Sequence, residues 1–584
     1  MKSKYVFMLV ALLFAWTIVG CSPETDSTDV EVAPDTNDDE EAPASNGSAY
    51  EVIENQVIPA SDLGAIPDSA IQRGDTVVAT LTEPGGVFNP FFYTNGYDGN
   101  VTAVMFPPLI DVDETGQPIE RLAEEWEVSE DGLTYTFTLR EGLTFDNGEP
   151  LTADDIEFTL TLLHDPAYAG GTDISEAKVV GGGDYKEGDA EAVSGIRVID
   201  ERTIEIETEE VNFRSLRLLG GQVLSKEYYG AGYEKGELDY IRDFHLEPVG
   251  AGPYKFDRYV PGQEIRYAAN PYYYEGEPEI DYFIYKTSEG DSTQFFQTGE
   301  VDFSGFPANP DNFELLQLLG FADINVYQSS AYSFIKFNHE KEVFADKRVR
   351  QAFIYGLDRQ TVVDTAYQGF AQVANVPVSP ESWAYTEDVE PYAFNPDKAR
   401  ELLEEAGWIE GADGIREKDG EKLVVHYFVT QGALSEILIP IAKENYADIG
   451  IQFETEQMDY NALLARTADG EHDLASFSTT MLSDPSDGVR YFQTDGGGSF
   501  TNTNGYSNER VDELIQQGLQ TFETEERAEV YHELYQELAE DPPYIFLLYG
   551  KVLSGSNARV EGFQPNGVRG ITPSLPNLKV IETE

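Results

Sequence analysis

The hydrophobic residues of this chain recur with two spacings, one typical of strands and one typical of helices. The segment 134–140 alternates polar and apolar residues strictly, so that Tyr135, Phe137 and Leu139 share one face, as in a half-buried strand. The segments 197–199 and 203–206 flank a short Asp-Glu-Arg turn, and this arrangement predicts a β-hairpin.

Other segments place apolar residues at positions i, i+3, i+4 and i+7, which is the spacing of one helix face. The clearest helix begins at Asn395, a favourable N-cap, and Pro396, which suits the first helical position, and Gly407 suits the position after its end. The same spacing recurs in three further stretches, at 349–356, 511–518 and 528–538. We interpret these apolar stripes as core-facing sides, and together with the strands they predict a large mixed α/β protein.

The first twenty residues have the features of a secretion signal. Lys2 and Lys4 precede an uncharged, mostly apolar run over 5–19, which as a helix would span about 22 Å and is therefore too short for a membrane span. The run ends in Ile-Val-Gly-Cys, which resembles a bacterial lipobox and contains the only cysteine of the chain. We expect residues 1–20 to be removed and Cys21 to be lipidated; the alternative is an ordinary signal peptide with a coincidental cysteine.

The segment after Cys21 is compositionally unsuited to folding. Residues 22–50 are rich in Ser, Thr, Pro, Asn, Asp and Glu and contain no Lys or Arg, so they repel one another and cannot bury a core. We interpret 21–71 as a lipidated cysteine followed by an acidic disordered tether, which would hold the folded body on the outer side of a membrane.

The charge balance excludes one class of function. Asp and Glu number 107 against 38 Lys and Arg, for a net charge of −69, and such a body repels phosphate backbones, so we expect no nucleic-acid partner. The acids are spread along the chain, which favours a solvated acidic surface of the kind that halophile proteins use in high salt. The competing interpretation is an acidic patch for a cationic ligand.

Motifs of catalysis and metal binding are mostly missing. The chain contains no G-x-S-x-G, G-x-x-x-x-G-K-[ST] or H-E-x-x-H, and one cysteine with six scattered histidines argues against a zinc site. The stretch 111–116 resembles the start of a calcium loop, but Leu122 stands where a bidentate Glu is needed, so a turn between strands is expected. We therefore expect no catalytic residue, no metal and no cofactor, although a chance pair of carboxylates at glycosidase spacing cannot be told from a real one by sequence.

Seven short motifs occur in a fixed order between residues 88 and 515. They are Phe-Asn-Pro at 88–90, Leu-Ala-Glu-Glu-Trp to Asp-Asn-Gly at 122–148, Pro-Leu-Thr-Ala-Asp-Asp at 150–155, Gly-Ala-Gly-Pro-Tyr at 250–254, the Val-Arg-Gln-Ala-Phe region at 344–359, Lys-Ala-Arg-Glu-Leu-Leu-Glu-Glu-Ala-Gly-Trp at 398–408, and Asp-Glu-Leu-Ile at 512–515. In this order they resemble the bacterial extracellular solute-binding protein family 5, the large receptors of oligopeptide and dipeptide ABC transporters.

The resemblance implies a periplasmic-binding-protein-like α/β fold with two lobes around a ligand cleft and an additional inserted domain. It places lobe I in three pieces and the other parts between them. The implied boundaries are 72–106, 248–330 and 549–584 for lobe I, 107–247 for the inserted domain and 331–548 for lobe II. Members of the family close on a solute by a hinge motion and deliver it to a membrane permease driven by ATPases, so the resemblance implies an extracytoplasmic, monomeric transport receptor without enzymatic activity.

The resemblance also implies two ligand-contacting loops. One corresponds here to Thr94, Asn95, Gly96 and Tyr97. The other is a W-x-x-D-Y-x-[DE]-P stretch, which aligns with Ser478, Thr479, Thr480, Met481, Leu482 and Asp484. Its first Asp pairs with the α-amino group of a peptide, but here that position is Met481 or, in the other register, Leu482, and neither can bind an ammonium group. Either Asp484 substitutes for the missing anchor or the ligand lacks that amine. Arg466, Asn502 and Asn504 are further pocket candidates.

Three hypotheses follow. The first is a peptide receptor of an ABC transporter, and the second is the same receptor for a non-peptide solute such as an oligosaccharide. The third is a secreted hydrolase on the same scaffold, which the missing catalytic motifs disfavour.

Overall fold

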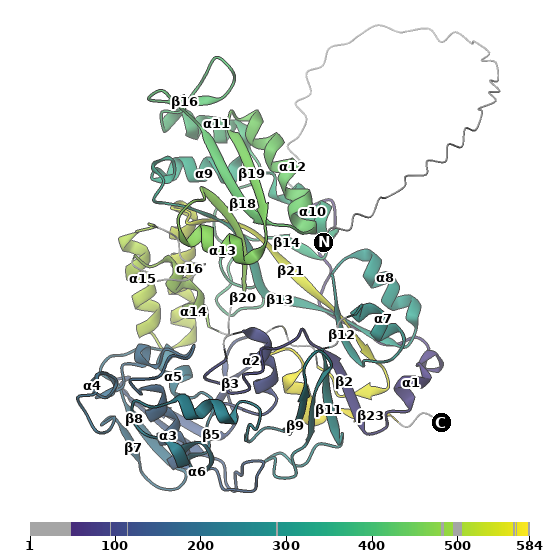
Figure 1. Ribbon diagram of the computed structural model, residues 1–584. Coiled ribbons are helices and arrows are strands. Elements are labelled where there is room, and N and C mark those ends of the chain that lie inside the picture. The colour runs from purple at the N-terminus through teal and green to yellow at the C-terminus, as the bar shows by residue number, and fades with distance from the viewer. Residues whose placement is uncertain are drawn as a thin grey trace, which may run out of the picture. The chain divides into compact units, whose positions relative to one another are not determined.

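A sheet of twelve strands dominates the described part of the protein (Figure 1). The structure is a computed structural model that describes residues 48–581 except 94, 114, 288–289, 481–483, 495–504, 565–566 and 568. In spatial order the strands are β19 (Gln452–Met458), β18 (Val424–Thr430), β20 (Leu474–Thr480), β13 (Ala322–Phe337), β21 (Tyr544–Asn557), β12 (Phe303–Phe306), β2 (Thr76–Thr80), β11 (Tyr282–Lys286), β10 (Glu264–Ala269) and β9 (Tyr254–Val260), with β1 (Gln56–Ile58) paired to β13 and β14 (Ala371–Val373) paired to β21.

Two long strands, β13 and β21, run through both halves of this sheet. β13 pairs with β1 at residues 324–326 and with β20 at residues 331–337. It also pairs with β21 along most of its length, but the register is irregular between Gln328 and Phe334. Since an irregular ladder has fewer hydrogen bonds to distort, bending of the sheet costs least at this point.

A second, separate sheet of four antiparallel strands contains the segments that alternate most clearly in the sequence. Its order is β5 (Ala123–Val128), β6 (Thr134–Leu139), β8 (Thr203–Glu207) and β7 (Ile196–Val198). The predicted strand is confirmed as β6, and Tyr135, Phe137 and Leu139 are fully buried. The predicted hairpin is confirmed as β7 and β8, which pair antiparallel. Two smaller sheets have two strands each, β3 (Ile110–Val112) with β4 (Pro118–Glu120) and β22 (Val560–Glu561) with β23 (Lys579–Val580). A third has three strands, β15 (Ile409–Glu410), β16 (Arg416–Lys418) and β17 (Glu421–Lys422).

The chain enters and leaves this four-stranded region through adjacent backbone segments. The amide of Leu109 donates to the carbonyl of Gly221 at 3.0 Å, and the amide of Gly252 donates to the carbonyl of Met105 at 2.8 Å. The turn predicted at 111–116 is confirmed as the β3–β4 hairpin, with Asp113 accepting backbone hydrogen bonds inside it. Figure 1 shows this region, with helices α3 to α6, grouped together.

The helices form where the apolar spacing predicts them. Asn395 caps α11 by accepting from the amide of Lys398, Pro396 is its first residue, and Gly407 after its end has a φ of 90°. The three other predicted stripes are buried on α9, α15 and α16. The helices are α1 (Asp68–Ile71), α2 (Gly96–Ala103), α3 (Ala153–Leu163), α4 (Gly182–Glu187), α5 (Arg214–Leu219), α6 (Lys226–Tyr229), α7 (Ser292–Gln297), α8 (Pro310–Leu319), α9 (Lys347–Tyr355), α10 (Arg359–Tyr367), α11 (Pro396–Glu405), α12 (Ala433–Asp448), α13 (Tyr460–Ala468), α14 (Pro485–Val489), α15 (Glu509–Gln520) and α16 (Thr524–Glu540).

A buried ion pair joins three distant parts of the chain beside the twelve-stranded sheet. The Arg559 guanidinium donates to both carboxylate oxygens of Asp302 at 2.7 Å, and both side chains are almost completely buried. Arg73 donates to the same carboxylate at 2.9 Å, and Arg559 also donates to the backbone carbonyls of Arg73 and Thr76. The start of β2, the start of β12 and the end of β21 are therefore fixed to one another.

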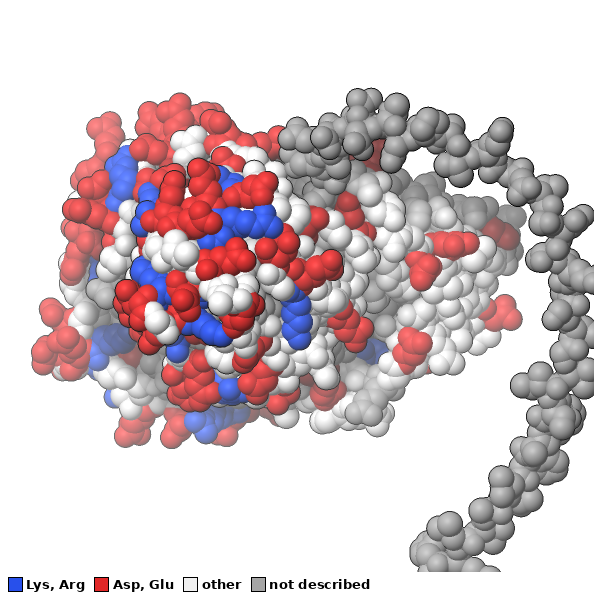
Figure 2. All heavy atoms as spheres, turned by 90° about the horizontal axis from the view of Figure 1, so that it is seen from above, with Lys and Arg blue, Asp and Glu red and all other residues white. Residues whose placement is uncertain are grey.

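Figure 2 shows acidic side chains crowded over one part of the visible face, with fewer basic ones between them, and scattered more thinly over the rest. Many of the surface arginines and lysines are paired with these acids, as Arg197 is with Glu205 and Glu207. Exposed pairs of this kind add little stability one by one. No helix in the described ranges is long and apolar enough to span a membrane.

Candidate functional site

The first predicted ligand loop lies at the start of α2. Asn95 is the N-cap, and its side chain accepts from the amides of Tyr97 and Asp98 at 3.0 Å. Asp98 is buried and accepts from the amides of Gly86 and Val87, so the turn before the helix is held in place. Tyr97 is exposed. Thr94 lies outside the described residues.

The second predicted loop follows β20. Ser478, Thr479 and Thr480 are the last residues of β20 and pair with β13, and the hydroxyl of Ser478 lies 2.7 Å from that of Ser333. Met481 and Leu482 lie outside the described residues. The last residue of β20, Thr480, pairs with Ala331 in the irregular part of β13, and α14 begins at Pro485.

Asp484, at the end of that loop, forms a buried ion pair. It caps α14 by accepting from the amide and hydroxyl of Ser486, and the Arg527 guanidinium donates to both of its carboxylate oxygens at 2.8 Å. Burial alone would raise the pKa of the Asp484 carboxyl, but Arg527 together with Ser486 outweighs burial and holds this pKa below its ordinary value. A ligand amine at Asp484 would therefore have to displace a buried guanidinium.

Aromatic rings enclose the guanidinium of Arg527. Its central carbon lies 3.6 Å from the ring centre of Phe213 and 5.0 Å from that of Trp383. Phe213 comes from the region 107–247, and its backbone amide donates to the carbonyl of Leu519 on α15 at 2.7 Å. The region 107–247 therefore contacts the helix pair α15–α16 directly, and this contact covers the ion pair that supports the second loop.

Arg466 stands apart from both loops in its contacts. It lies on α13, donates to Glu456 and Glu471, and stacks over the ring of Phe428 at 4.3 Å. Through these contacts Arg466 joins α13 to the neighbouring strands β18 and β19.

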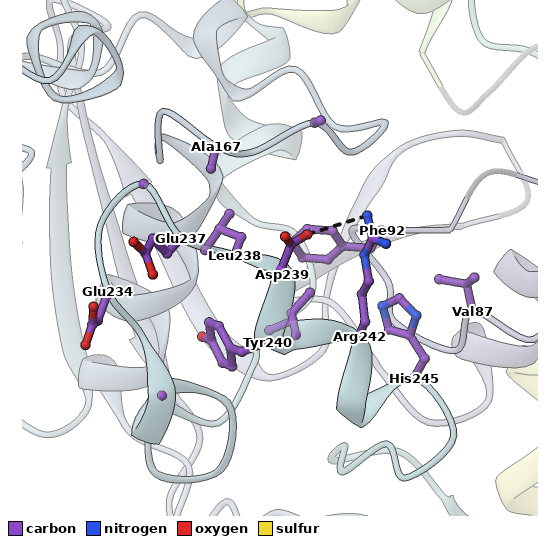
Figure 3. A pocket seen from close by; sticks show the side chains of 14 residues that line it. Val87, Phe92, Ala167, Glu234, Glu237, Leu238, Asp239, Tyr240, Arg242 and His245 are labelled. Atoms are coloured by element: carbon purple, nitrogen blue, oxygen red, sulfur yellow. Dashed lines mark ion pairs between the residues drawn. The ribbon is translucent and has the colours of Figure 1, made fainter.

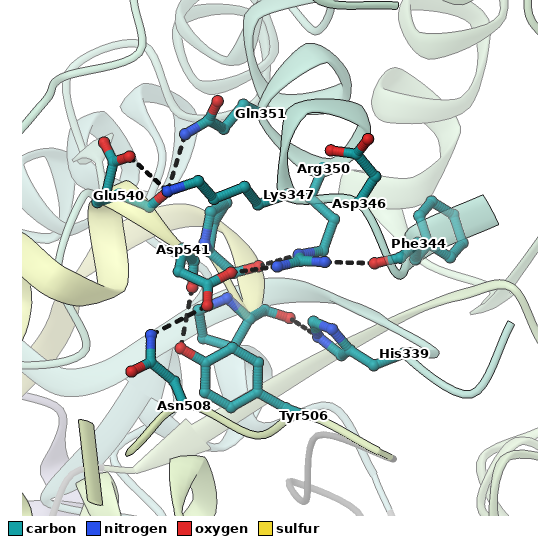
Figure 4. A network of polar contacts seen from close by, with 12 residues as sticks. His339, Phe344, Asp346, Lys347, Arg350, Gln351, Tyr506, Asn508, Glu540 and Asp541 are labelled. Atoms are coloured by element: carbon teal, nitrogen blue, oxygen red, sulfur yellow. Dashed lines mark hydrogen bonds and ion pairs between the residues drawn. The ribbon is translucent and has the colours of Figure 1, made fainter. Parts of the chain in front are cut away.

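Asn502 and Asn504 lie outside the described residues, but the chain on both sides of them is well anchored. The hydroxyl of Thr494 lies 3.0 Å from that of Ser507, so the two ends of the segment 495–504 meet. The later end is held by a polar network, in which Tyr506 donates to the carbonyl of Asp541 and Asn508 donates to its carboxylate, both at 3.0 Å (Figure 4).

The same network binds α9 to the end of α16. Arg350 donates to the Asp541 carboxylate and to the carbonyl of Pro542, and Lys347 donates to Glu540 (Figure 4). His339 lies 3.2 Å from the carbonyl of Pro543, and burial, followed by the nearby charge of Arg350, lowers the pKa of His339 to about 3, so this ring is neutral. The network therefore fixes the chain at Tyr506 and Asn508 to α9 and to the end of α16.

A cavity of about 610 Å³ lies next to α2. We call it the arginine cavity, because the described residues that line it include Arg214, Arg217, Arg490 and Arg569. Tyr93, Gly99, Thr102 and Ala103 line it from α2 and the turn before it. None of the predicted ligand residues that the structure describes is among its lining.

Ion pairs link the arginine cavity to several segments. Glu176 pairs with Arg214 and, at 3.0 Å, with Arg490, which follows α14. Asp111 pairs with Arg569 and also with Arg121 at 3.2 Å. Each of these carboxylates is thus shared by two guanidinium groups, and the pair of Arg490 with Glu176 joins the chain after the second loop to the region 107–247.

We compared the sequence and the structure of this protein with those of known proteins. The chain matches the bacterial extracellular solute-binding proteins, family 5, over residues 117–500. The chain belongs to this family. The oligopeptide-binding protein AppA of Bacillus subtilis is 29% identical over 84% of this chain and 89% of its own length, and the structure of AppA in complex with a nonapeptide matches with a TM-score of 0.71 over 87% of this chain and 99% of that one.

Other relatives are named for different ligands. The dipeptide-binding protein of Escherichia coli is 26% identical over 85% of this chain and 93% of its own length. The heme-binding protein A of Haemophilus influenzae is 26% identical over 83% of this chain and 89% of its own length.

Membership of family 5 confirms several expectations at once. The fold is the periplasmic-binding-protein type, with the large mixed sheet described above. Family 5 proteins are extracytoplasmic transport receptors of ABC transporters and not enzymes, so the hypothesis of a secreted hydrolase is set aside. The described ranges contain no group of three or more His, Cys, Asp or Glu residues placed to hold a metal ion.

A second cavity of this family 5 receptor, of about 920 Å³, has a different character (Figure 3). The segment 234–245 supplies most of its polar groups, and the ion pair between Asp239 and Arg242 at its edge is largely exposed. Solvent competes with any ligand for such groups. We therefore regard this cavity as a surface hollow.

The resemblance pointed to the two loops but not to the arginine cavity beside them. Arg214 and Arg217 are three residues apart on α5, a spacing that puts two side chains on one helix face and is visible in the sequence. Arg490 and Arg569 each stand alone in the sequence and carry no signal, because only the fold brings them together.

Proposed function

We propose that this protein is the peptide receptor of an ABC transporter, and that it captures an oligopeptide between two lobes. The observation that carries the proposal is the similarity to AppA, whose structure holds a nonapeptide and matches along nearly its whole length. The proposal uses the lobe boundaries expected from the sequence, with lobe I at 72–106, 248–330 and 549–584, the inserted domain at 107–247 and lobe II at 331–548. The partners would be permease subunits with their ATPases, and the receptor would act as a monomer.

The cleft would then lie between α2 and the loop after β20. A peptide in extended form could pair with backbone there, as in β-augmentation. The long strands β13 and β21 are shared by both halves of the sheet, and the irregular register of β13 between Gln328 and Phe334 supports a hinge at that point.

A specific departure favours a second candidate. Met481 or Leu482 replaces the acid that would bind a peptide amine, and Asp484 is held by Arg527. Both observations suit a ligand without a free α-amino group. A non-peptide solute such as an oligosaccharide therefore remains the alternative, and the heme-binding relative illustrates that family 5 receptors with other ligands exist.

Native mass spectrometry of the purified protein, followed by calorimetric titration, tests the function. We expect a peptide to bind with one-to-one stoichiometry. We also expect less than about tenfold preference for a free peptide over its N-acetylated form, whereas a buried ammonium–carboxylate anchor would give a preference of about 30-fold or more. Met481→Asp, or Leu482→Asp in the other register, should raise that ratio. Binding of an oligosaccharide or heme while every peptide fails would establish the alternative.

We further propose that Cys21 carries the lipid anchor and that the acidic segment after it tethers the body to the outer face of the membrane. The lipobox resemblance and the acidic composition support this. The tether is shorter than the expected 21–71, because β1 (Gln56–Ile58) pairs with β13 and α1 (Asp68–Ile71) is a helix. Cys21→Ser should release the protein from the membrane fraction or block signal cleavage, and unchanged fractionation of that variant would contradict the proposal.

The acidic surface supports a halophile setting. Because the self-repulsion of the −62 charge on residues 51–584 (the −69 of the whole chain without Lys2, Lys4 and the nine acids of the tail) is screened as the Debye length falls to about 3 Å near 1 M salt, the melting temperature should rise between 0.05 and 2 M NaCl. A flat or falling melting temperature would mean that the acids are locally paired.

A further inference from the structure

We infer that the arginine cavity is the subsite for a carboxylate of the ligand, so that this receptor selects acidic peptides. The inference rests on the proposed peptide function. In it, arginines that bind a ligand carboxylate replace the missing acid that would bind a ligand amine. The receptor would thus recognise a negatively charged carboxylate of the peptide instead of its positively charged α-amino group.

The concentration of arginine is the first argument. The whole chain has only 38 basic residues among 584, yet four of them line one cavity of about 610 Å³, and its described lining contains no lysine. A guanidinium group presents a planar fork of donors that matches the two oxygens of a carboxylate. The cavity therefore has the donor type that an acidic group requires.

The arrangement of the resident carboxylates is the second argument. Glu176 and Asp111 each bridge two guanidinium groups, so the cavity already shows that a carboxylate can sit between arginines there. A ligand carboxylate would join this network and accept charge-assisted hydrogen bonds. Burial lowers the pKa of the Arg569 guanidinium to about 10, and the group is therefore still charged at neutral pH.

The walls of the cavity supply the rest of a binding site. Apolar residues also line the cavity and can contact the aliphatic part of an acidic residue or the side chain next to it. They are Pro90, Phe91, Phe106, Pro108, Ile110 and Leu218.

The origin of Arg490 links the cavity to ligand capture. Arg490 directly follows α14, which begins after the loop that contains Met481 and Leu482, and it reaches Glu176 in the region 107–247. A carboxylate bound at this pair would contact both parts of the protein at once. Binding energy of this kind favours the closed form over an open one.

Three matched peptides separate the possible sources of the carboxylate. The first has both termini blocked and only neutral side chains, the second has a free C-terminus, and the third has blocked termini and one internal Glu. Titrations in 1 M NaCl screen the long-range repulsion of acidic peptides by this acidic protein. We expect the second or the third peptide to bind about 10- to 100-fold more tightly than the first, which is the range of a charge-assisted hydrogen bond.

Arg490→Gln should abolish most of that preference. Arg197→Gln is the matched control, because Arg197 is similarly exposed and also paired with glutamates, but on the four-stranded sheet. A variant that only loosens closure would weaken all three peptides equally, so the ratio between acidic and neutral peptides distinguishes recognition from a structural role. Equal binding of all three peptides to the unmodified protein would overturn the inference and leave the peptide function intact. Failure of every peptide would overturn both.

Discussion

Two buried ion pairs of this protein have the same chemistry and different surroundings. Arg559 with Asp302 and Arg527 with Asp484 both bring two guanidinium nitrogens within 2.8 Å of a carboxylate. The first lies among β2, β12 and β21, where its arginine also donates to backbone carbonyls. The second involves the N-cap of α14 and is covered by Phe213 from the region 107–247.

The comparison teaches that a buried pair can hold a fold together or support a contact that opens and closes. Around Arg559 the surrounding groups belong to one sheet, so nothing there changes when a ligand binds. Around Arg527 one wall is a ring from a different part of the chain, and movement of that part would expose the pair to water. We therefore expect the first pair to affect stability alone, and the second to affect stability, pH response and binding.

The largest effect is expected from the Arg559 pair. Arg559→Met leaves Asp302 buried beside Arg73 alone and removes donors to two carbonyls, so unfolding free energy should fall by about 3–5 kcal/mol. Urea unfolding measures it, with Arg197→Gln as an exposed control that should change stability by less than about 1 kcal/mol. The affinity of the folded fraction for ligand should stay unchanged, and a specific loss of affinity would break the distinction between the two pairs.

A somewhat smaller loss, about 3 kcal/mol, is expected for Arg527→Met, because Ser486 still donates two hydrogen bonds to Asp484. The pH response sharpens the comparison. In the unmodified protein the pKa of Asp484 is lowered, so its contribution to stability is complete above the ordinary pKa near 3.8 and is lost as pH falls through the folded value.

Without Arg527 burial dominates and the pKa of Asp484 should rise above its ordinary value. The sign then reverses, since a raised carboxyl pKa favours folding at low pH and this contribution is lost as pH rises. Melting temperatures of the two proteins between pH 4 and pH 8 check this. Parallel curves would show that Asp484 titrates normally in the variant and that the buried environment described here is wrong.

The smallest effect on stability and the most specific one on function is expected from Phe213→Ala. Loss of one cation–π contact should cost about 0.5–2 kcal/mol, which is about 2- to 30-fold in ligand affinity if the contact forms only on closure. Phe213→Leu keeps an apolar side chain but loses the ring, and Tyr at the same position restores it. If all three variants bind like the parent, the Phe213 contact does not report on closure.

Much of the fold could be predicted from the sequence, because local patterns specify it. The predicted elements depend on residues that are close together in the sequence. They are the strand around Tyr135, the capped helix α11 and the helices α9, α15 and α16 with their apolar stripes. The order of strands in the large sheet has no such local signature and was not predicted.

The candidate site was harder to predict for the same reason. The resemblance located the start of α2 and the end of β20, but Arg490 and Arg569 meet only after chain segments about 80 residues apart fold together. The family resemblance also gave no reason to pair Asp484 with Arg527, which lies 43 residues further along the chain. Charge pairs between distant segments leave no periodic pattern in a sequence.

The long ladder between β13 and β21 has a consequence for how the chain is made. Its partners are more than 200 residues apart, so β13 emerges from the ribosome well before the strand that covers it. At about 5–20 residues per second this interval lasts roughly 10–40 s. During that time β13 has an unpaired edge, which is prone to association with other chains. Folding is therefore expected to wait until the last strand has been synthesised and exported, and a chaperone that holds the unfinished chain would be needed until then.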